Sequence, residues 1–393
     1  MAAPLPRTFW VLWIGTLINR LGGFVAPFLA LSLWQGRGLS LAVAGVVASL
    51  YGVGGMVASL VGGVLADRLG RRAVLLISLL VGPILMVALG LARSPVAIAV
   101  LALVVGSLYE LYRPAVAAVV ADVVPGLDRP RAYGLLYWAI NLGAAVAPVV
   151  AGVMARRSYL WLFVADAATT FLYGLVVAAG VDETRPAVAP TDDRAAGLTP
   201  VLADRLFMAF SGLTFVTALL MVQGWTALSL YLAGRGLAAS TYGLVIAVNG
   251  LVIIAVQPFA TKALERHDRG RVLAAGALLL GLGLLGNALV HRPWLYAVAV
   301  AVWTLGEVAT LPLASAIVAD LAPAQLRGRY QGMHSTAWGV GAVAGSTSGA
   351  LLLAGGGDRL WWLCGAIAAA LAFGYRAFGR ALLKARSSLG TVP

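Results

Sequence analysis

Hydrophobic positions fall into long runs separated by short breaks that carry charge, glycine or proline. A bilayer core about 30 Å thick requires about 20 apolar residues per helix, and the runs have that length. The pattern therefore predicts twelve transmembrane helices. Six are expected in the first half, at 8–34, 40–66, 73–92, 96–121, 132–155 and 159–181. Six more are expected in the second half, at 206–233, 240–261, 272–290, 294–319, 330–354 and 360–382.

One long polar stretch, 182–205, separates the two sets of runs and contains several acidic residues and prolines. Such a composition is typical of a linker. The pattern thus predicts an all-α membrane protein with an N-terminal six-helix bundle at 1–181 and a C-terminal six-helix bundle at 206–393. The linker is expected in the cytoplasm.

Composition supports a membrane protein, because 61% of the residues are hydrophobic and only 11% are charged. Soluble domains have about 45–50% apolar and about 25% charged residues. The net charge of +13 is spread over many loops, so nucleic acid is not an expected partner. A single cysteine, Cys364, excludes an internal disulfide and a CxxC metal site.

The distribution of basic residues predicts the orientation. If the N-terminus is cytoplasmic, most of the 28 Lys and Arg residues fall on the cytoplasmic loops and tail. This agrees with the positive-inside rule and places both termini in the cytoplasm. The first apolar run is too long for the hydrophobic region of a signal peptide, so we expect it to be retained as a helix. Trp10, Trp161, Trp294, Trp361 and Trp362 are expected at the membrane interfaces.

The two halves resemble each other at a nearly constant offset. GRGL occurs at 36–39 and again at 234–237, Pro114 corresponds to Pro312, and Asp122 corresponds to Asp320. Parallel repeats of six helices are one way in which secondary transporters build two halves around a substrate site. The repeat therefore favours a transporter over a channel or a membrane enzyme.

The segment GVLADRLGRRAVL at 63–75 resembles the signature between helices 2 and 3 of the major facilitator superfamily. The matching residues are Gly63, Asp67, Arg68, Gly70, Arg71 and Arg72. The resemblance implies a charge cluster that closes the cytoplasmic side and opens during transport. A simple positive-inside anchor is the alternative.

Four further residues are assigned to this cytoplasmic gate. Asp122 and Asp320 are expected at the cytoplasmic ends of two helices, paired with arginines such as Arg68, Arg71 or Arg269. A degraded copy of the signature at 265–271 contributes Asp268 and Arg269. Stabilisation of helix ends is the plainer alternative for the two aspartates.

The segment at 141–152 resembles the antiporter signature through Gly143, Pro148 and Gly152, although Ala147 and Ala151 replace two of its glycines. This implies membership of the twelve-helix drug/proton antiporter branch. A packing face of small residues would account for the same glycines.

Ionisable side chains inside membrane helices are costly and usually face a cavity or a partner. The predicted helices contain Arg20, Glu110, Arg113, Asp166 and Glu307. Glu110 and Arg113 are three residues apart and are expected to pair on one helix face. We interpret Glu110 as the main proton-carrying group and Arg113 as the residue that tunes it, with a static ion pair as the alternative.

Glu307 is interpreted as a second proton-coupling residue, with substrate contact and a structural role equally open. Asp166 is expected to have a packing role. In the superfamily helices 1, 4, 7 and 10 usually line the cavity. Aromatic and polar residues of the predicted helices are candidates for contact with the substrate, with a packing or interface role as the alternative. These are Asn19, Arg20, Tyr109, Tyr112, Trp138, Asn141, Gln223, Trp225 and Trp303.

These patterns predict a secondary active transporter that works by alternating access. Proton-coupled efflux of hydrophobic or cationic drug-like compounds is the first expectation, and a carrier of a small metabolite is the alternative. An enzyme is not expected, because HExxH, GxSxG and GxxxxGK[ST] motifs are absent. We expect no metal and no cofactor, protons as the coupling ion, a small-molecule substrate, a monomer, and location in a bacterial inner membrane.

Overall fold

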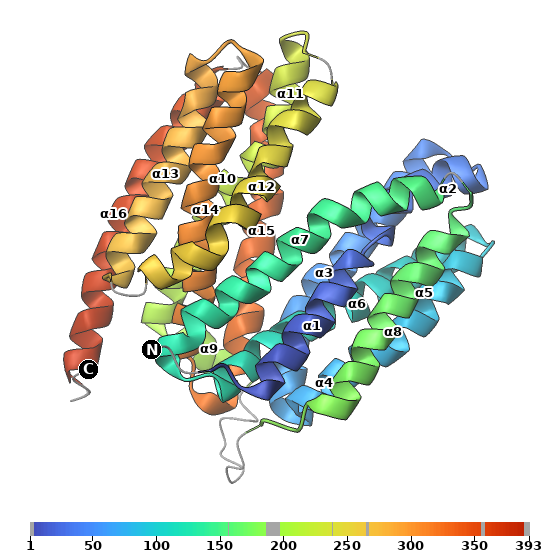
Figure 1. Cartoon of the computed structure of the whole chain (residues 1–393), viewed down its shortest axis with the longest axis horizontal. Helices are drawn as coiled ribbons and strands as arrows, with labels where there is room; N and C mark the ends of the chain where they lie inside the picture. Colours follow the sequence, from blue (N-terminus) through green and yellow to red (C-terminus); the bar gives the residue numbers. More distant parts are fainter. Residues whose placement is uncertain are drawn as a thin grey trace. The chain divides into compact units, whose positions relative to one another are not determined.

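A computed structural model describes residues 4–155, 157–185, 197–237, 239–264, 267–354 and 358–388. Helices occupy all twelve of the predicted ranges (Figure 1). The first half contains α1 (Arg7–Leu21), α2 (Val25–Arg37), α3 (Leu41–Leu69), α4 (Arg71–Leu76), the π-helical turn η1 (Ile77–Val81), α5 (Gly82–Leu91), α6 (Pro95–Val123), η2 (Gly126–Asp128), α7 (Arg129–Ala155) and α8 (Leu160–Gly180). The second half contains α9 (Thr199–Ala203), α10 (Arg205–Trp225), α11 (Ala227–Gly234), α12 (Ala239–Leu264), α13 (Arg269–Leu289), α14 (Pro293–Leu321), η4 (Ala324–Leu326), α15 (Arg327–Ala354) and α16 (Asp358–Ser388).

Not every predicted span is a single apolar helix. Among the described residues, eight helices are long and apolar enough to cross a membrane, or nine if the bent helix α3 counts as one span. The first predicted span, 8–34, is broken into α1 and α2.

The chain forms two compact units. The first contains residues 1–199 and 319–335, and the second contains residues 200–318 and 336–393. The boundary near residue 199 falls inside the predicted linker, of which residues 186–196 lie outside the described residues. The segment 319–335 clusters with the first unit although it comes from the second half of the sequence. The predicted division at 181 and 206 stays a prediction.

Glycines allow close helix packing within each unit. In the first unit α3 packs along α6, and a Cβ atom added at Gly54 would lie 2.2 Å from the carbonyl oxygen of Leu103. In the second unit α13 packs along α16, where a Cβ atom at Gly270 would lie 2.7 Å from the Cα atom of Gly379. Small residues at such seams let backbones approach and gain dispersion energy in lipid.

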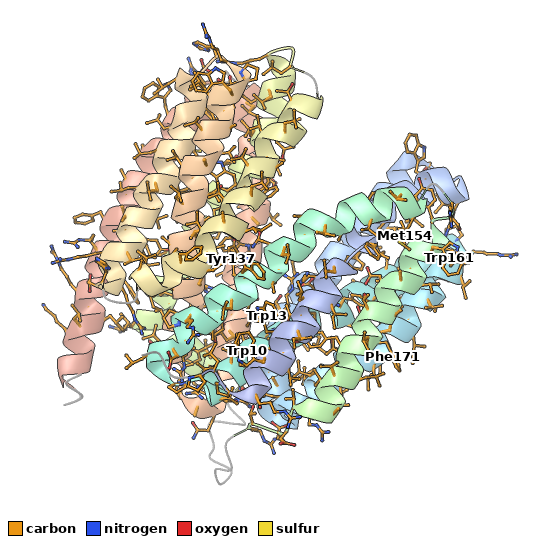
Figure 2. All side chains as sticks on the ribbon, in the orientation of Figure 1. Trp10, Trp13, Tyr137, Met154, Trp161 and Phe171 are labelled. Atoms are coloured by element: carbon orange, nitrogen blue, oxygen red, sulfur yellow. The ribbon has the colours of Figure 1, made fainter. Side chains whose placement is uncertain are left out.

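Apolar side chains project outward along the helices (Figure 2). Trp10, Trp161, Trp294 and Trp362 are between 39% and 60% exposed, as expected for residues that contact lipid or headgroups. Trp361 is an exception and corrects the prediction, because it is fully buried and its ring contacts Tyr231 edge-on.

Replacing Gly54 by alanine should destabilise the protein by about 1–3 kcal/mol, because the new methyl group overlaps the backbone of α6. The control is Gly52→Ala, two residues away on α3, where an added Cβ atom meets nothing within 4 Å. Thermal unfolding in detergent measures both variants. Equal unfolding midpoints would show that the α3–α6 seam does not depend on the glycine.

Candidate functional site

Asp67 of the signature segment binds the first turn of α15. Its side chain is buried, and its carboxylate oxygens accept the backbone N–H of Gly328 at 3.0 Å and that of Arg329 at 2.9 Å. Amides in the first turn of a helix lack intrahelical acceptors and carry partial positive charge. Gly63 permits this approach, since a Cβ atom there would lie 2.1 Å from the carbonyl oxygen of Gly328. Asp67 therefore acts as a cap for a helix distant in sequence.

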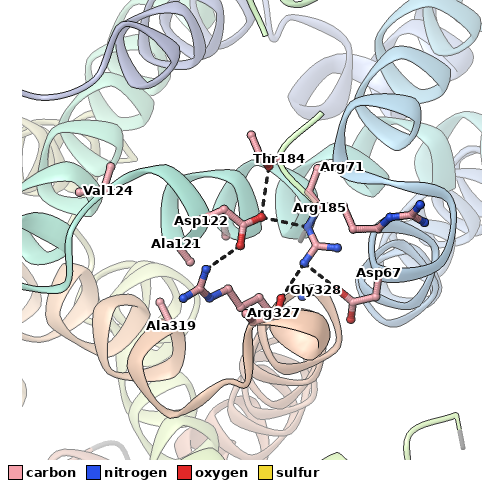
Figure 3. A network of polar contacts seen from close by, with 12 residues as sticks. Asp67, Arg71, Ala121, Asp122, Val124, Thr184, Arg185, Ala319, Arg327 and Gly328 are labelled. Carbon is pink, nitrogen blue, oxygen red and sulfur yellow. Dashed lines mark hydrogen bonds and ion pairs between the residues drawn. The ribbon is translucent and has the colours of Figure 1, made fainter. Parts of the chain in front are cut away.

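Arg71 lies at the centre of a buried polar network (Figure 3). Its guanidinium is 3.2 Å from Asp67 and 3.1 Å from Asp122, and it donates to the carbonyl of Ala324 at 3.1 Å. Two carboxylates thus balance a cation with no solvent exposure. A buried charge is tolerated only when it is paired and hydrogen-bonded in this way.

Two further ion pairs follow the internal repeat. Arg327 lies 2.7 Å from Asp122, and Arg129 lies 2.5 Å from Asp320. The two arginines correspond to each other in the internal repeat, and so do the two aspartates. Each arginine therefore pairs with the aspartate from the other half of the sequence. All four residues belong to the first unit, which explains why segment 319–335 clusters with it. Sequence reasoning missed both arginines, although the repeat aligns them.

Glu183 is another residue that sequence reasoning missed. Its carboxylate accepts the backbone N–H of Arg71 at 2.9 Å and of Arg72 at 3.2 Å, and so caps α4. Gly70 precedes this helix with a φ of 109°, and a Cβ atom there would lie 2.3 Å from Glu183. The next residue, Thr184, donates to Asp122 at 3.2 Å. The start of the predicted linker is therefore part of the network.

Other predicted gate residues have different roles. The side chain of Arg68 is exposed, and its backbone carbonyl accepts a hydrogen bond from Arg185 at 2.6 Å. Arg72 donates to the carbonyl of Ala178 at the end of α8. Asp268 caps α13 through the N–H of Arg271 at 2.9 Å. Of the predicted partners of Asp122 and Asp320, Arg71 is confirmed by its ion pair with Asp122. Two arginines that were not predicted also take part, since Arg327 pairs with Asp122 and Arg129 pairs with Asp320.

A second polar site of the first unit lies in the middle of the span formed by α6. Glu110 and Arg113 form an ion pair with 2.7 Å between nitrogen and oxygen. The side chain of Glu110 is 26% exposed and that of Arg113 is 48% exposed. The ion pair is therefore accessible at the surface of the protein, in contrast to the buried network around Arg71. This is the pairing expected from the spacing of three residues.

The predicted cavity residues of α1 connect three helices. Arg20 donates to the hydroxyl of Tyr112 at 2.9 Å, and this hydroxyl donates to Asn19 at 3.0 Å. Asn19 in turn donates to Thr170 of α8 at 2.8 Å. Gly143 of the antiporter-like segment allows α7 to approach here, since a Cβ atom would lie 2.4 Å from the Cβ atom of Arg20. Pro148 and Gly152 lie further along α7.

The other candidates of the first unit are engaged in packing. Tyr109 is buried in the apolar core. Trp138 stacks on Trp13, with ring centroids 6.0 Å apart and planes inclined by 10°. Asn141 donates to the carbonyl of Tyr137 in its own helix. The structure gives these three residues structural contacts, and their contact with substrate stays a prediction.

In the second unit Glu307 lies in a buried polar cluster. Glu307 is 5% exposed and accepts the side-chain amide of Asn249 at 2.8 Å. The same amide donates to the hydroxyl of Thr304 at 2.9 Å. Because α12 and α14 each contribute, the cluster fixes the position of Glu307 between two helices.

The remaining cavity candidates of the second unit differ in burial: two are buried and one is exposed. Gln223 is buried and donates to the carbonyl of Gly345 in α15. Trp303 is fully buried and packs beside Gly224, and its contact with substrate stays a prediction. Trp225 is 45% exposed and contacts Trp303 edge-on. Their spacing in the sequence did not distinguish these environments.

Comparison with known proteins adds to this picture. A protein 26% identical over 351 residues is the Na(+), Li(+), K(+)/H(+) antiporter of Planococcus maritimus, with 81% of this chain and 82% of the antiporter covered. The multidrug resistance protein MdtG of Enterobacter lignolyticus is 26% identical over 382 residues and covers 91% of this chain and 88% of its own. The crystal structure of the human organic anion transporter MFSD10 superposes with a TM-score of 0.78 at 18% identity, covering 95% of this chain and all of its own.

The antiporter and MFSD10 are transporters and not enzymes. The family model described as Major Facilitator Superfamily matches residues 12–234 and 224–388. Together these matches span almost the whole chain and include both units. The chain therefore belongs to the major facilitator superfamily and is a multi-pass membrane transporter of its two-bundle, twelve-helix fold.

Proposed function

We propose that the protein exports hydrophobic or cationic drug-like compounds across a bacterial inner membrane in exchange for protons. The observation that carries the proposal is the accessible ion pair of Glu110 and Arg113 within the span of α6. The similarity to a multidrug resistance protein and to a proton antiporter supports the same assignment.

The chemistry of Glu110 supplies a means of exchange. When ionised, its carboxylate attracts Arg113 or a positively charged substrate. When protonated, it loses that attraction, and the charge of Arg113 is no longer balanced by its partner at 2.7 Å. A proton and a cationic substrate therefore compete for one group, and alternate occupation from opposite sides of the membrane gives antiport. Proton binding needs no cofactor.

The network around Arg71 is proposed as the cytoplasmic gate. Access from the cytoplasm would require segment 319–335 to move away from Asp67, Asp122 and Arg129. The charges would then become hydrated, which offsets the cost of separating them. Such a gate has two discrete states, as alternating access requires.

Cells that produce the protein should accumulate less of a fluorescent lipophilic cation than cells with an empty vector. A protonophore should abolish the difference, because the proton gradient drives export. Equal accumulation with correctly inserted protein would argue against drug export. Release or uptake of labelled sugars or amino acids in the same cells would favour the metabolite carrier.

A second candidate function is exchange of an alkali cation for protons. It is favoured by two buried oxygen ligands, the carboxylate of Glu307 and the hydroxyl of Thr304, which both accept a hydrogen bond from the side-chain amide of Asn249. Oxygen donors of this kind suit hard cations, and one relative is an antiporter of Na(+), Li(+) and K(+). In everted vesicles, addition of these ions should release stored protons, and Glu307→Gln should prevent it. A lack of response to all three ions would exclude this candidate.

A further inference from the structure

We propose that Asp166 of α8 is a second proton-binding site of the first unit and that its protonation state controls the bend between α1 and α2. This inference rests on the proposed function only in taking the proton as the coupling ion. It assigns to Asp166 a role beyond the packing role expected from sequence.

The break in the first span is built around this carboxylate. Helix α1 ends at Leu21, and α2 begins at Val25. The Oδ2 atom of Asp166 accepts the N–H of Phe24 at 3.1 Å and that of Val25 at 3.0 Å. Phe24 and Val25 are buried, so the amides that the helix break leaves open need a partner from the protein. Asp166 supplies that partner and faces the positive end of the α2 dipole.

Helix α8 holds α1 at each turn up to the break. The hydroxyl of Thr16 is 3.3 Å from that of Tyr173, and Asn19 donates to Thr170. A Cβ atom added at Gly22 would lie 1.9 Å from the hydroxyl oxygen of Thr169. The polar contacts to α1 along this seam come from hydroxyl and amide groups, which stay neutral over the physiological pH range. Asp166, at the end of the seam, is the group whose charge can change.

The charge of Asp166 is balanced differently from that of Glu110. Asp166 is 4% exposed, and no arginine or lysine among the described residues forms an ion pair with it within 4.0 Å. The charged and titratable groups that face it are Arg20 from α1, Tyr109 from α6 and Tyr51 from α3. Arg20 donates to Tyr112 instead. Binding of a proton therefore removes the charge that holds α2 without leaving an ion-pair partner behind.

The far end of α2 is held independently of protons. Arg37 donates to the carbonyls of Leu89, Gly90 and Ala92 at the end of α5, at 2.6–2.9 Å. Helix α2 is thus attached at one end by an arginine that stays charged and at the other by a carboxylate that can be neutralised. Protonation of Asp166 weakens the inner attachment alone, so α2 can pivot about its outer end.

Hydrogen–deuterium exchange of purified protein in nanodiscs tests this at the peptide that covers residues 22–37. After correction for intrinsic rates, exchange of the first α2 amides should rise about tenfold from weakly basic to acidic pH, which corresponds to the loss of one charge-assisted hydrogen bond. In Asp166→Asn the exchange should be high and independent of pH. The matched control is Asp204→Asn, which removes the charge of the side chain that accepts the N–H of Phe207 in α10 and should leave α2 unchanged.

Infrared difference spectra of the wild type provide a second readout. The C=O stretch of a protonated carboxyl group should appear on acidification, and Asp166→Asn should lack it. Wild-type exchange at α2 that does not change with pH would overturn the proposal, even if the variant failed to fold. The pH response of α2 should persist in Glu110→Gln, because it needs no substrate. Loss of the pH response of α2 in Glu110→Gln would contradict the proposal that Asp166 binds its proton independently of Glu110. Failure of transport, with the pH response of α2 intact, would contradict only the proposed function.

Discussion

Replacing Arg71 by methionine should lower the free energy of unfolding by about 3–5 kcal/mol, the usual cost of removing one partner from a buried ion pair. Methionine fills a similar volume, so the loss comes from charge and hydrogen bonds. Asp67 and Asp122 would face each other without the guanidinium that lies 3.2 Å and 3.1 Å from them. The midpoint of thermal unfolding in detergent measures the effect.

Two controls separate this role from a general need for positive charge. Arg68→Met removes an exposed arginine of the same signature and should change stability by about 0.5 kcal/mol or less. Arg71→Lys should recover only part of the loss, because lysine lacks the planar fork that reaches Asp67, Asp122 and Ala324 at once. Full stability in the methionine variant would show that the network does not depend on Arg71.

Replacing Glu110 by glutamine should abolish accumulation driven by a pH gradient in vesicles that contain the protein. Glutamine keeps the shape of the side chain and a hydrogen-bond acceptor near Arg113, but it does not bind a proton in the pH range of the experiment. Exchange of labelled for unlabelled substrate at equal pH should continue, since it requires movement between states without net proton transfer. Glu110→Asp keeps a carboxylate and should retain part of the driven transport. Loss of exchange in the glutamine variant would indicate a structural role for Glu110.

The positions of the helices could be predicted because each helix corresponds to a continuous run of apolar residues. The break at Gly22 and Gly23 could not, since hydropathy is high on both sides of it. Two glycines permit the bend, but Asp166, far away in sequence, stabilises it through Phe24 and Val25. The decisive contact is therefore tertiary. This is why the first predicted span, 8–34, is two helices.

The candidate site was predictable where partners are close in sequence. Glu110 and Arg113 pair because three residues bring side chains to one helix face. Glu183 was not predictable, because its role depends on the return of the chain after α8 to the start of α4. Trp303 shows the same limit, since burial against Gly224 depends on how α10 and α14 pack.

The most direct test of proton exchange at Glu110 is proton movement in sealed proteoliposomes that contain a pH-sensitive dye. Addition of a lipophilic cation without a pH gradient should drive protons in the opposite direction in the wild type. The signal should return to the level of empty liposomes in Glu110→Gln and be partly retained in Glu110→Asp. Substrate-driven proton movement of wild-type size in Glu110→Gln would contradict the account.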